Sequence, residues 1–595
     1  MDRKSLIVLG LSLALLLGWV PLTHKIWGPP PAPTNTVSEA SVTTSNGEPA
    51  TVTTTTTTTS TSTATAASTL LVAPNTPEET LTLVAEDIQY IFTSHGGGVK
   101  LVELTKYPHS VGSKNGTDTN NFVSLNTKAP VPMMTLLGGT ALEGDGIYKL
   151  TQDGNTVRAE KALTNNLYIV KEFTVGTNYL LHTKVRIENR SGENMRLPAQ
   201  TLIFGTATPQ SAHDDESTMG FIWYNGKKDE HIGGTWFANR FLGCFPGTPR
   251  SEYLEGENNV QWAAVNNQFF AIAAVPKDTA PKVVSRRIDL PPPNAYEIAH
   301  DSRAKLSPHG YQTGFVYPES ILPANGSVER EYDLFTGPRE YNTLSRLATK
   351  YNNNLDLVMN FGGFWGYFPK ILLLSMNGLA AFGLNYGWAI VCITVIIKLI
   401  FWPLTHASTK SMKRMAALSP ELKKIQEKYK EDPQKLAQKQ MELWREHKVN
   451  PFGSCLPMVL QIPVFFGFFK MLRTAIELRG AEFLWVADLS QPDTIFVIPG
   501  INFPVNPLPI IMGVTMLWQA NITPAAPSAD PVQQKMMKYM PLIFLFVLYN
   551  YSAGLAVYWT TNNLLTILQT KMTNSEPDKP VAESTKPVAP VKKKK

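Results

Sequence analysis

A lysine inside a membrane-length apolar segment is the residue of greatest chemical consequence in this sequence. Residues 386–405 read YGWAIVCITVIIKLIFWPLT, and Lys398 carries their one charge. An ammonium group near the centre of a membrane helix costs roughly 2.5 to 3.5 kcal/mol to insert, so it normally faces a protein interior or a water-filled cavity. The alternative is a side chain that stretches toward the cytoplasmic headgroups, since Thr405 lies only about 10 Å further along the helix.

Other polar side chains in the apolar segments favour the cavity. They are Thr394, Gln461, Gln519, Thr560, Thr561, Asn562 and Asn563. Hydrogen bonding between helices is the structural alternative for such groups. However, these segments contain no acidic residue that would neutralise Lys398, and an uncompensated charge needs water or a substrate. We therefore predict a hydrated groove around Lys398.

Sequence patterns typical of enzymes are missing. Cys244, Cys392 and Cys455 are far apart and form no CxxC pair, and the ten histidines show no HExxH spacing, so we expect neither a disulfide framework nor a metal site. The acidic cluster at residues 213–215, HDD, reads as a polar loop without a nucleophile. The nucleotide-binding pattern GxxxxGK[ST] is absent. We predict no catalytic residue, no cofactor and no enzyme activity.

Six apolar spans are expected to position the groove. A chain of 595 residues that is 43% hydrophobic and only 17% charged is unusual for a soluble protein. Residues 1–27 form the first span, and the lack of an A-x-A cleavage site favours a retained anchor over a cleaved signal peptide. The second span is residues 386–405. Residues 452–572 supply the other four, at 452–471, 507–521, 537–551 and 554–568.

The distribution of charge predicts the topology. Residues 406–450 carry eleven basic and six acidic residues and show helical spacing of apolar residues, so we predict a helical hairpin on the cytoplasmic side. The N-terminus and the C-terminus then both lie in the cytoplasm. The basic tail, 573–595, ends in four lysines that can bind anionic lipid or the phosphates of ribosomal RNA. The continuous apolar run within residues 355–385 is too short to span, and we predict an amphipathic helix on the membrane surface, over residues 364–382.

The region between the first two spans divides into a tether and a β domain. Residues 28–78 are rich in Pro, Ser and Thr and predict a disordered tether. Residues 79–345 show short alternating runs, as in 181–188, where Leu181, Thr183, Val185 and Ile187 alternate with polar residues. This pattern predicts a large antiparallel β-sandwich, which the topology places on the periplasmic side.

Several strings in the second half of the chain resemble the YidC/Oxa1/Alb3 family of membrane protein insertases, in particular its Gram-negative bacterial branch. They are KVNPFGSCLPMVLQIPVFFGFF at 448–469, ELR at 477–479, ADLSQPD at 487–493, MGVTM at 512–516, DPVQQKMMKYMP at 530–541 and GLAVYWTTNNLLTILQ at 554–569. The resemblance is strong over 355–572 and weaker over the β domain, which corresponds to the large periplasmic domain of that family. The tether has no specific counterpart.

The resemblance implies five spans around a hydrophilic groove that opens to the cytoplasm and the lipid and is closed toward the periplasm. Many relatives have an arginine in this groove; here Lys398 keeps the charge without the bidentate guanidinium. Ser552 replaces a common proline before the last span. The groove residues that we predict are Lys398, Thr394, Gln461, Gln519, Tyr558, Trp559, Asn562 and Asn563.

The function implied is the insertion and folding of bacterial inner-membrane proteins, alone or with the Sec translocon. Nascent membrane proteins and the lipid bilayer are the expected partners, with the ribosome and a targeting factor docking on the hairpin and tail, and the working unit is expected to be a monomer. A secondary transporter of a small anionic solute is the alternative, but it predicts internal repeats and an acidic coupling residue, and we find neither. A third reading, a carbohydrate-binding or cell-envelope β domain on a membrane anchor, needs neither six spans nor Lys398.

Overall fold

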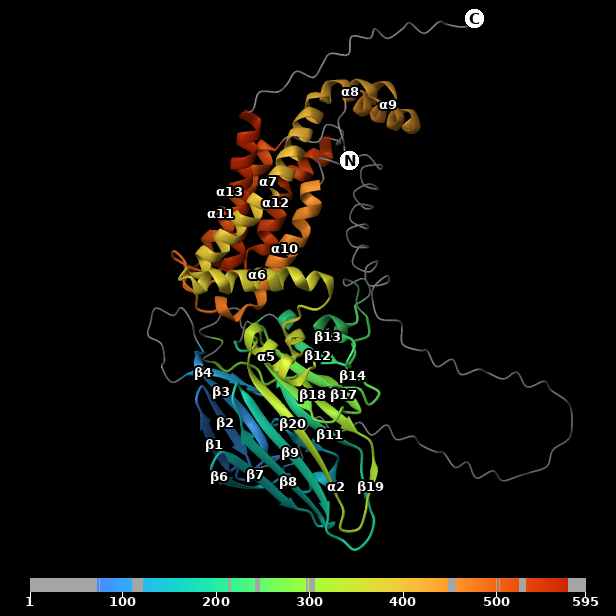
Figure 1. The fold of residues 1–595 in the computed structure, drawn as a ribbon, viewed down its shortest axis with the longest axis vertical. Coiled ribbons are helices and arrows are strands. Elements are labelled where there is room, and N and C mark those ends of the chain that lie inside the picture. The colour runs from blue at the N-terminus through green and yellow to red at the C-terminus, as the bar shows by residue number, and fades with distance from the viewer. Residues whose placement is uncertain are drawn as a thin grey trace, which may run out of the picture.

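The computed structural model describes residues 72–575 apart from gaps at 74, 110–120, 212–213, 215, 241–244, 246, 296–297, 299–304, 448–455, 499, 502 and 524–530. The predicted anchor (1–27), nearly all of the predicted tether (28–78) and nearly all of the predicted tail (573–595) lie outside the described residues. The described chain forms a β domain followed by a helical bundle (Figure 1).

The β domain is built from antiparallel strands whose side chains alternate between the core and solvent. In β9 (Leu180–Asn189) the predicted alternation is confirmed, because Thr183, Val185 and Ile187 are buried while His182 is exposed. The largest sheet has the order β13 (Asp229–Gly233), β12 (Gly220–Tyr224), β15 (Trp262–Asn266), β16 (Phe270–Pro276), β20 (Ser327–Pro338), β9 (Leu180–Asn189), β8 (Leu167–Val175), β7 (Thr156–Ala162) and β6 (Lys149–Asp153).

Two smaller sheets complete the core of this domain. One has the order β14 (Glu252–Glu255), β17 (Lys282–Asp289), β18 (His309–Tyr317), β11 (Gln200–Ala207) and β5 (Thr135–Leu137), and the other β1 (Thr80–Ala85), β2 (Ile88–Thr93), β3 (Gly98–Pro108) and β4 (Phe122–Leu125). Strand β11 contacts β15 and β16 of the large sheet. Aromatic pairs fill the core, with ring centroids 5.1 Å apart for Phe92 and Phe173. This is the predicted antiparallel sandwich.

Short elements decorate the sandwich. They are β10 (Met195–Leu197) paired with β19 (Ser320–Leu322), the helices α2 (Thr140–Glu143) and α3 (Gly234–Ala238), and the 3-10 turn η1 (Glu216–Thr218). After β20 the chain enters α5 (Tyr341–Tyr351) and then the 3-10 turn η2 (Leu355–Met359).

Helix α6 (Gly363–Ala381) lies across the base of the helical bundle, roughly perpendicular to it (Figure 1). Its Lys370 and Asn377 both turn toward neighbouring polar groups, since Lys370 lies 4.0 Å from Asp356 and Asn377 donates to Glu477. Trp365, Tyr367 and other large apolar side chains of α6 are exposed. We predict this helix over residues 364–382, and α6 covers 363–381, between η2 and a glycine-containing turn.

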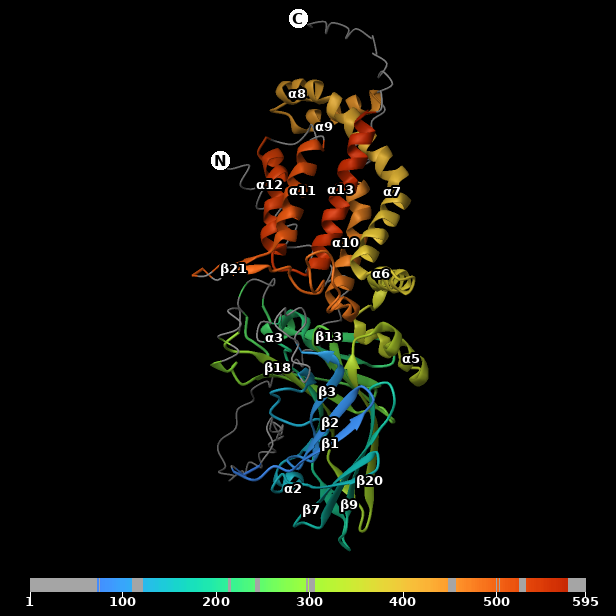
Figure 2. The same ribbon diagram turned by 90° about the vertical axis from the view of Figure 1, so that its left-hand side faces the viewer.

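The bundle and the hairpin are formed by seven helices among the described residues. These are α7 (Tyr386–Ala417), α8 (Ser419–Lys428), α9 (Pro433–Glu446), α10 (Leu456–Thr474), α11 (Pro507–Ile522), α12 (Pro531–Leu548) and α13 (Ala553–Ser575). A 3-10 turn, η4 (Ile476–Leu478), follows α10, and β21 (Phe496–Ile498) pairs with β22 (Phe503–Val505) before α11. Helices α8 and α9 form the predicted hairpin at the end far from the β domain (Figure 2).

One helix joins the second span to the hairpin. We predict the end of the span at residue 405 and a helical segment after it, and α7 runs through both, to Ala417. Residues 406–417 consist mainly of Ser, Thr, Ala, Lys and Met, which are compatible with a helix. A change from apolar to polar surroundings does not by itself end a helix. The break comes at Leu418, before Pro420, a residue type that is favoured in the first turn of a helix.

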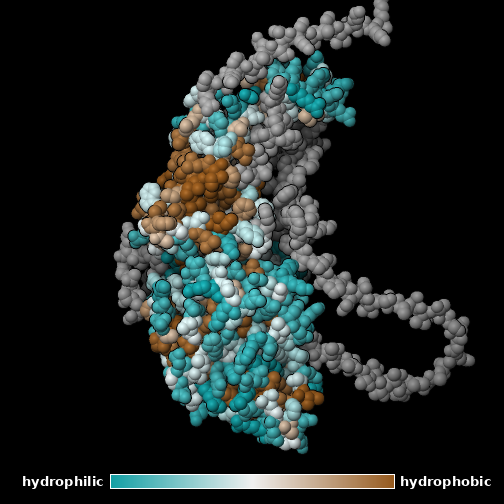
Figure 3. All heavy atoms as spheres, in the orientation of Figure 1, coloured by the Kyte–Doolittle hydropathy of each residue, from teal (hydrophilic) through white to brown (hydrophobic). Residues whose placement is uncertain are grey.

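A hydrophobic band covers the visible face of the bundle, between the hydrophilic β domain and the hydrophilic hairpin (Figure 3). Among the described helices, α7 is the one that is both long enough and apolar enough to cross a membrane, with a mean hydropathy of 2.1. A shorter apolar stretch, Tyr539–Leu548, lies within α12.

Hydrogen bonds join the β domain to the base of the bundle. The buried guanidinium of Arg339, which follows β20, donates to the carbonyls of Asn267, Gln268 and Val358 at 2.9 to 3.1 Å. The Gln268 amide donates to the Arg473 carbonyl at 3.1 Å. These bonds satisfy backbone carbonyls at the junction and fix the bundle relative to the sandwich.

A carboxyl group with a perturbed pKa lies at this junction. Burial raises the pKa of Glu477, although its Oε1 atom accepts a 2.9 Å hydrogen bond from the Asn377 amide on α6. The Glu477 Oε2 and Asn377 Oδ1 atoms are buried and lack hydrogen-bond partners among the described residues. Both are acceptors when Glu477 is ionised, so the protonated form of Glu477 is the one that the fold favours.

We predict that the stability conferred by Glu477 is greatest in mild acid and is lost as the pH rises through its raised pKa. Glu477→Gln keeps an acceptor and adds a donor. At pH 8 this substitution should raise the apparent melting temperature in detergent by a few degrees, which corresponds to about 1 to 3 kcal/mol in the free energy of unfolding. At pH 5 the increase in melting temperature should be smaller. Glu482→Gln, at an exposed carboxylate nearby, is the control and should show no such pH-dependent gain. An equal gain at both pH values would contradict this explanation.

Candidate functional site

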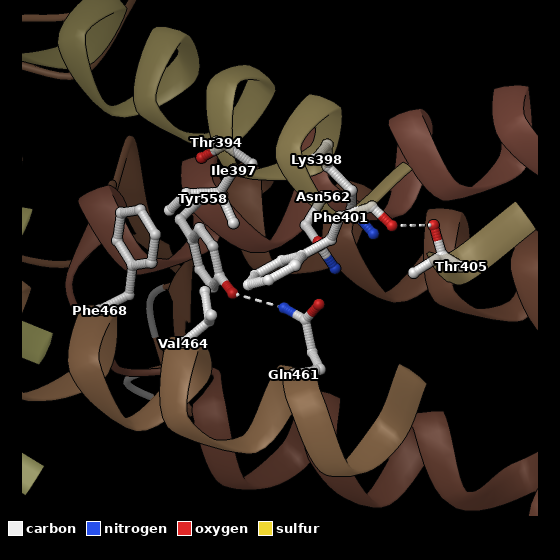
Figure 4. A pocket seen from close by; sticks show the side chains of 10 residues that line it. All are labelled: Thr394, Ile397, Lys398, Phe401, Thr405, Gln461, Val464, Phe468, Tyr558 and Asn562. Atoms are coloured by element: carbon white, nitrogen blue, oxygen red, sulfur yellow. Dashed lines mark hydrogen bonds between the residues drawn. The ribbon is translucent and has the colours of Figure 1, made fainter. Parts of the chain in front are cut away.

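A pocket lies inside the bundle between α7, α10 and α13 (Figure 4). Its lining combines polar and aromatic side chains: Thr394, Ile397, Lys398, Phe401, Thr405, Gln461, Val464, Phe468, Tyr558 and Asn562. Five of the eight groove residues expected from the sequence are therefore brought together here. They are Thr394, Lys398, Gln461, Tyr558 and Asn562.

The depth of Lys398 is set from the start of α7. The Asn385 side chain caps the helix by accepting from the Gly387 N–H at 2.8 Å, and its amide donates to the Glu482 carbonyl at 2.7 Å. Gly387 packs so closely on Phe483 that an added Cβ would lie 2.2 Å from the ring. Lys398 follows twelve residues after Tyr386, which is about 18 Å along the helix and more than half the roughly 30 Å thickness of a bilayer core.

The Lys398 ammonium is half-buried and donates a 2.8 Å hydrogen bond to the Thr566 Oγ1 atom on α13. The Thr566 hydroxyl in turn donates to the Asn562 carbonyl at 2.7 Å. Within the described part of the chain, no carboxylate pairs with Lys398, and this hydroxyl is the one hydrogen-bond partner of its ammonium. Since an ammonium has three donors, two remain for water or a bound group.

Across the pocket, the Gln461 amide on α10 donates to the Tyr558 hydroxyl at 3.0 Å (Figure 4). Tyr558 is buried, and its ring stacks on Phe468 with centroids 4.0 Å apart. The Thr394 hydroxyl donates back to the Ile390 carbonyl, one turn earlier in α7. The Tyr558 and Gln461 side chains therefore hold one another in place, while Lys398 retains unused donors.

Between the pocket and the hairpin, polar groups continue along the contact between α7 and α13. The Gln569 amide donates to the Thr405 hydroxyl at 2.5 Å and to the Trp402 carbonyl at 3.3 Å. Further toward the hairpin, His406 Nδ1 lies 3.1 Å from the Thr573 hydroxyl. Together with the bond between Lys398 and Thr566, these contacts form a polar ladder between the two helices.

The sequence reasoning missed five members of this arrangement: Thr405, His406, Thr566, Gln569 and Thr573. A signal for the last three is present in the sequence, because polar residues recur at spacings of three and four along the last span, at Tyr558, Asn562, Thr566, Gln569 and Thr573. That spacing places them on one face of a helix. The groove residues predicted in this span end at Asn563 and leave out the rest of this stripe.

Three predicted groove residues, Gln519, Trp559 and Asn563, lie outside the lining of this pocket. Asn563 is buried and donates to the Thr515 hydroxyl on α11 at 3.1 Å. Trp559 packs on Phe465 with ring centroids 4.8 Å apart. The reason is helical geometry: Tyr558 and Asn562 share one face of α13, whereas Trp559 and Asn563 are turned by about 100° from them. Gln519 is half-buried on α11, which contributes no residue to this lining.

Comparison with known proteins gives matches over most of the chain. Residues 80–372 match the family model described as the YidC periplasmic domain, and residues 378–580 match the model described as the 60Kd inner membrane protein. A protein named membrane protein insertase YidC from Syntrophus aciditrophicus is 30% identical over 594 residues, covering 97% of this chain and 100% of that protein.

A second protein of the same name, from Geobacter sulfurreducens, is 31% identical over 586 residues, covering 96% of this chain and 97% of that protein. Among solved structures, an active YidC insertase with its first transmembrane domain resolved matches at 19% identity and a TM-score of 0.33. That match covers 86% of this chain and 95% of the solved one.

The bond between Lys398 and Thr566 leads to a prediction. Thr566→Val preserves the shape of the side chain and removes the hydroxyl that the ammonium binds, so we expect a loss of about 1.5 to 3 kcal/mol in the free energy of unfolding in detergent. Thr566→Ser, which keeps the hydroxyl, should lose much less. In a double-mutant cycle, Thr566→Val should cost little in a Lys398→Met background. A full cost in that background would show that Thr566 acts through packing alone.

Proposed function

The chain belongs to the YidC family of membrane protein insertases, and from this membership we propose that its polar pocket is the groove that receives hydrophilic segments of a protein being inserted. Proteins of this family insert proteins into the bacterial inner membrane and carry a periplasmic domain, which here is the β domain. They are not an enzyme class. The lipid bilayer and membrane proteins are the partners that follow from this membership.

The observation that carries the proposal is the unneutralised ammonium of Lys398 inside the bundle. The ammonium donates one hydrogen bond, to the Thr566 hydroxyl at 2.8 Å. Its other two donors can bind a carboxylate of an incoming chain. A pair of opposite charges 4 Å apart at an effective dielectric constant of 20 interacts by about 4 kcal/mol. Such an attraction holds an acidic segment transiently without trapping it.

The mechanism proposed is physical and breaks no covalent bond. A polar segment entering lipid loses its hydration, at several kcal/mol for each unpaired polar group. A wet groove that reaches the depth of Lys398 leaves that segment hydrated for about half of the distance. The hydrophobic segment next to it moves sideways into lipid, and the burial of its apolar surface supplies the driving free energy.

For the topology, we propose six spans with both termini in the cytoplasm. The spans are 1–27, 386–405 and the four within 452–572; residues 28–78 are a tether, 79–345 the periplasmic β domain and 355–385 a surface helix. Residues 406–450 form a cytoplasmic hairpin. The position of α8 and α9 at the end of the bundle opposite the periplasmic domain supports this assignment (Figure 1), and the excess of basic residues in the hairpin agrees with it.

The hairpin and the tail, 573–595, are proposed to receive substrates from the ribosome or a targeting factor, and the bundle to work as a monomer, alone or with the Sec translocon. Phosphate-rich and acidic partners fit the basic surface of these segments. The alternative, a secondary transporter of a small anionic solute, lacks support from the family matches.

The charge of Lys398 can be tested by depleting the protein in cells and restoring it as a variant. The substrate is a short single-span protein with an acidic periplasmic tail, and its translocation is followed by protease accessibility. Lys398→Glu should reduce translocation by about tenfold or more, which corresponds to about 1.4 kcal/mol or more, because it repels the tail. Lys398→Ala should have an intermediate effect, and Lys398→Arg should restore full activity. Lys571→Glu, at an exposed lysine of α13, is the control.

Full rescue by both Lys398→Ala and Lys398→Glu would contradict the role of the charge while leaving the family function intact. A second substrate with a neutral tail separates charge attraction from a general defect, since its translocation should depend much less on Lys398. Equal loss for both tails would mean that the substitutions damage the bundle.

A further inference from the structure

The hairpin formed by β21 and β22 projects sideways from the helical bundle. It lies between α10 and α11 in the chain, and Figure 2 shows it at the same level as α6 but on the opposite side of the bundle. Residues Phe496 and Val505 pair across it, as do Ile498 and Phe503. A two-stranded hairpin of this kind is at best marginally stable in water by itself, so its surroundings must account for its persistence.

The composition of this hairpin is unusual for a loop exposed to water. Residues 494–506 read TIFVIPGINFPVN and include no charged residue. Their large apolar side chains are exposed, with the following fractions of surface accessible: Ile495 55%, Phe496 54%, Val497 43%, Ile501 71% and Phe503 45%. Neighbouring residues in a strand point to opposite faces, and both Phe496 and Val497 are exposed, so both faces of the hairpin are apolar.

The base of the hairpin is fixed to the bundle. The Asn506 amide donates to the carbonyl of Tyr549 at 2.9 Å, and the Tyr549 hydroxyl donates to the Pro504 carbonyl at 2.8 Å. The Phe503 and Tyr549 rings stack with centroids 5.2 Å apart. The Thr494 hydroxyl donates to Asn506 Oδ1 at 2.7 Å. The arm therefore has a defined direction and height relative to α12, which ends just before Tyr549.

Lipid is the occupant that these surroundings favour. The apolar surface continues directly from the hairpin into α11, where Ile510, Ile511 and Val514 are exposed. Trp485, close to the hairpin in the chain, is 47% exposed and donates its indole N–H to Asp493 at 3.2 Å. Exposed Trp and Tyr side chains with one polar end are typical of the boundary between a bilayer and water.

The depth of insertion is limited by the backbone. The outer edges of a two-stranded hairpin have N–H and C=O groups that no strand pairs, and hydrocarbon penalises such groups strongly. Pro504 removes one of these donors from β22, but the others need water or headgroup oxygens. The hairpin therefore fits the interfacial layer, where its apolar side chains reach the upper acyl chains and its backbone stays hydrated.

We propose that the β21–β22 hairpin is a lipid-binding arm that lies in the periplasmic leaflet, with Phe496, Val497 and Ile501 among the upper acyl chains of phospholipids. This inference rests on the topology under the proposed function, in which α6 lies on the periplasmic membrane surface. The arm and α6 then both contact the periplasmic leaflet, on opposite sides of the bundle.

The test uses the full-length chain with Cys244, Cys392 and Cys455 replaced by serine. Single cysteines are introduced as Phe496→Cys or Ile501→Cys, labelled with an environment-sensitive nitrobenzoxadiazole probe, and reconstituted into vesicles of phosphatidylethanolamine and phosphatidylglycerol. Some vesicles carry a nitroxide near the top of the acyl chain and others near its end. Ile321→Cys in β19, 72% exposed, is the control in the β domain, and Val514→Cys in α11, 60% exposed, is the control in the bundle.

We expect the probes at 496 and 501 to be quenched by the shallow nitroxide more than by the deep one, and to be protected from aqueous iodide. The probe at 321 should be quenched by iodide alone. If 496 and 501 behave like 321 while 514 is quenched by lipid, the arm is not in the membrane and the proposed topology stands.

If 514 is also insensitive to lipid, both the arm and the proposed topology fail. Protection of 496 and 501 from iodide without quenching by either nitroxide would show that protein, such as a second copy of the chain, covers the hairpin, and would overturn the lipid assignment. Stronger quenching by the deep nitroxide would overturn the interfacial depth.

Discussion

A positive charge in the middle of an apolar helix has to be stabilised by something other than lipid, and much of the bundle follows from this constraint. Lys398 obtains one hydrogen bond from Thr566 and shares its pocket with Gln461 and Tyr558. Placing these groups around one ammonium requires α7, α10 and α13 to face each other with their polar sides. The apolar sides of the same helices are then left for lipid, which gives the hydrophobic band of the surface (Figure 3).

The β domain acts as the base on which this arrangement is built. Arg339 and Gln268 join the end of the sandwich to η2 and to the end of α10, and Asn385 and Phe483 fix the start of α7. Every one of these contacts lies at the periplasmic end of the bundle. The opposite end carries the ladder between α7 and α13 and the small core of the hairpin, formed by Met415, Leu418, Leu422 and Leu443.

Periodicity in the sequence was enough to predict the antiparallel sandwich, the start of α7 and the hairpin, because each depends on local alternation of polar and apolar residues. The position of Lys398, a single charge inside an apolar segment, was also evident from the sequence. What could not be read was the rotation of α13 about its axis, which decides that Asn562 lines the pocket and Asn563 contacts Thr515 on α11. Thr566 belongs to the polar stripe of α13 that the spacing of three and four residues indicates, but that spacing does not show which helix the stripe faces. The order of the strands across the sheets depends on long-range pairing, which alternation does not encode.

Helix α7 connects the hairpin mechanically to the base of the bundle, because it is one continuous helix. Its 32 residues extend about 48 Å at the usual rise, with the hairpin at one end, the fixed contact with Phe483 at the other and Lys398 between them. A rigid helix carries a displacement of the hairpin along its length to the ammonium. Pro403, inside the helix and five residues from Lys398, interrupts the backbone hydrogen bonding at that point. Any displacement of the hairpin along α7 therefore reaches the Lys398 pocket through the turn that contains Pro403.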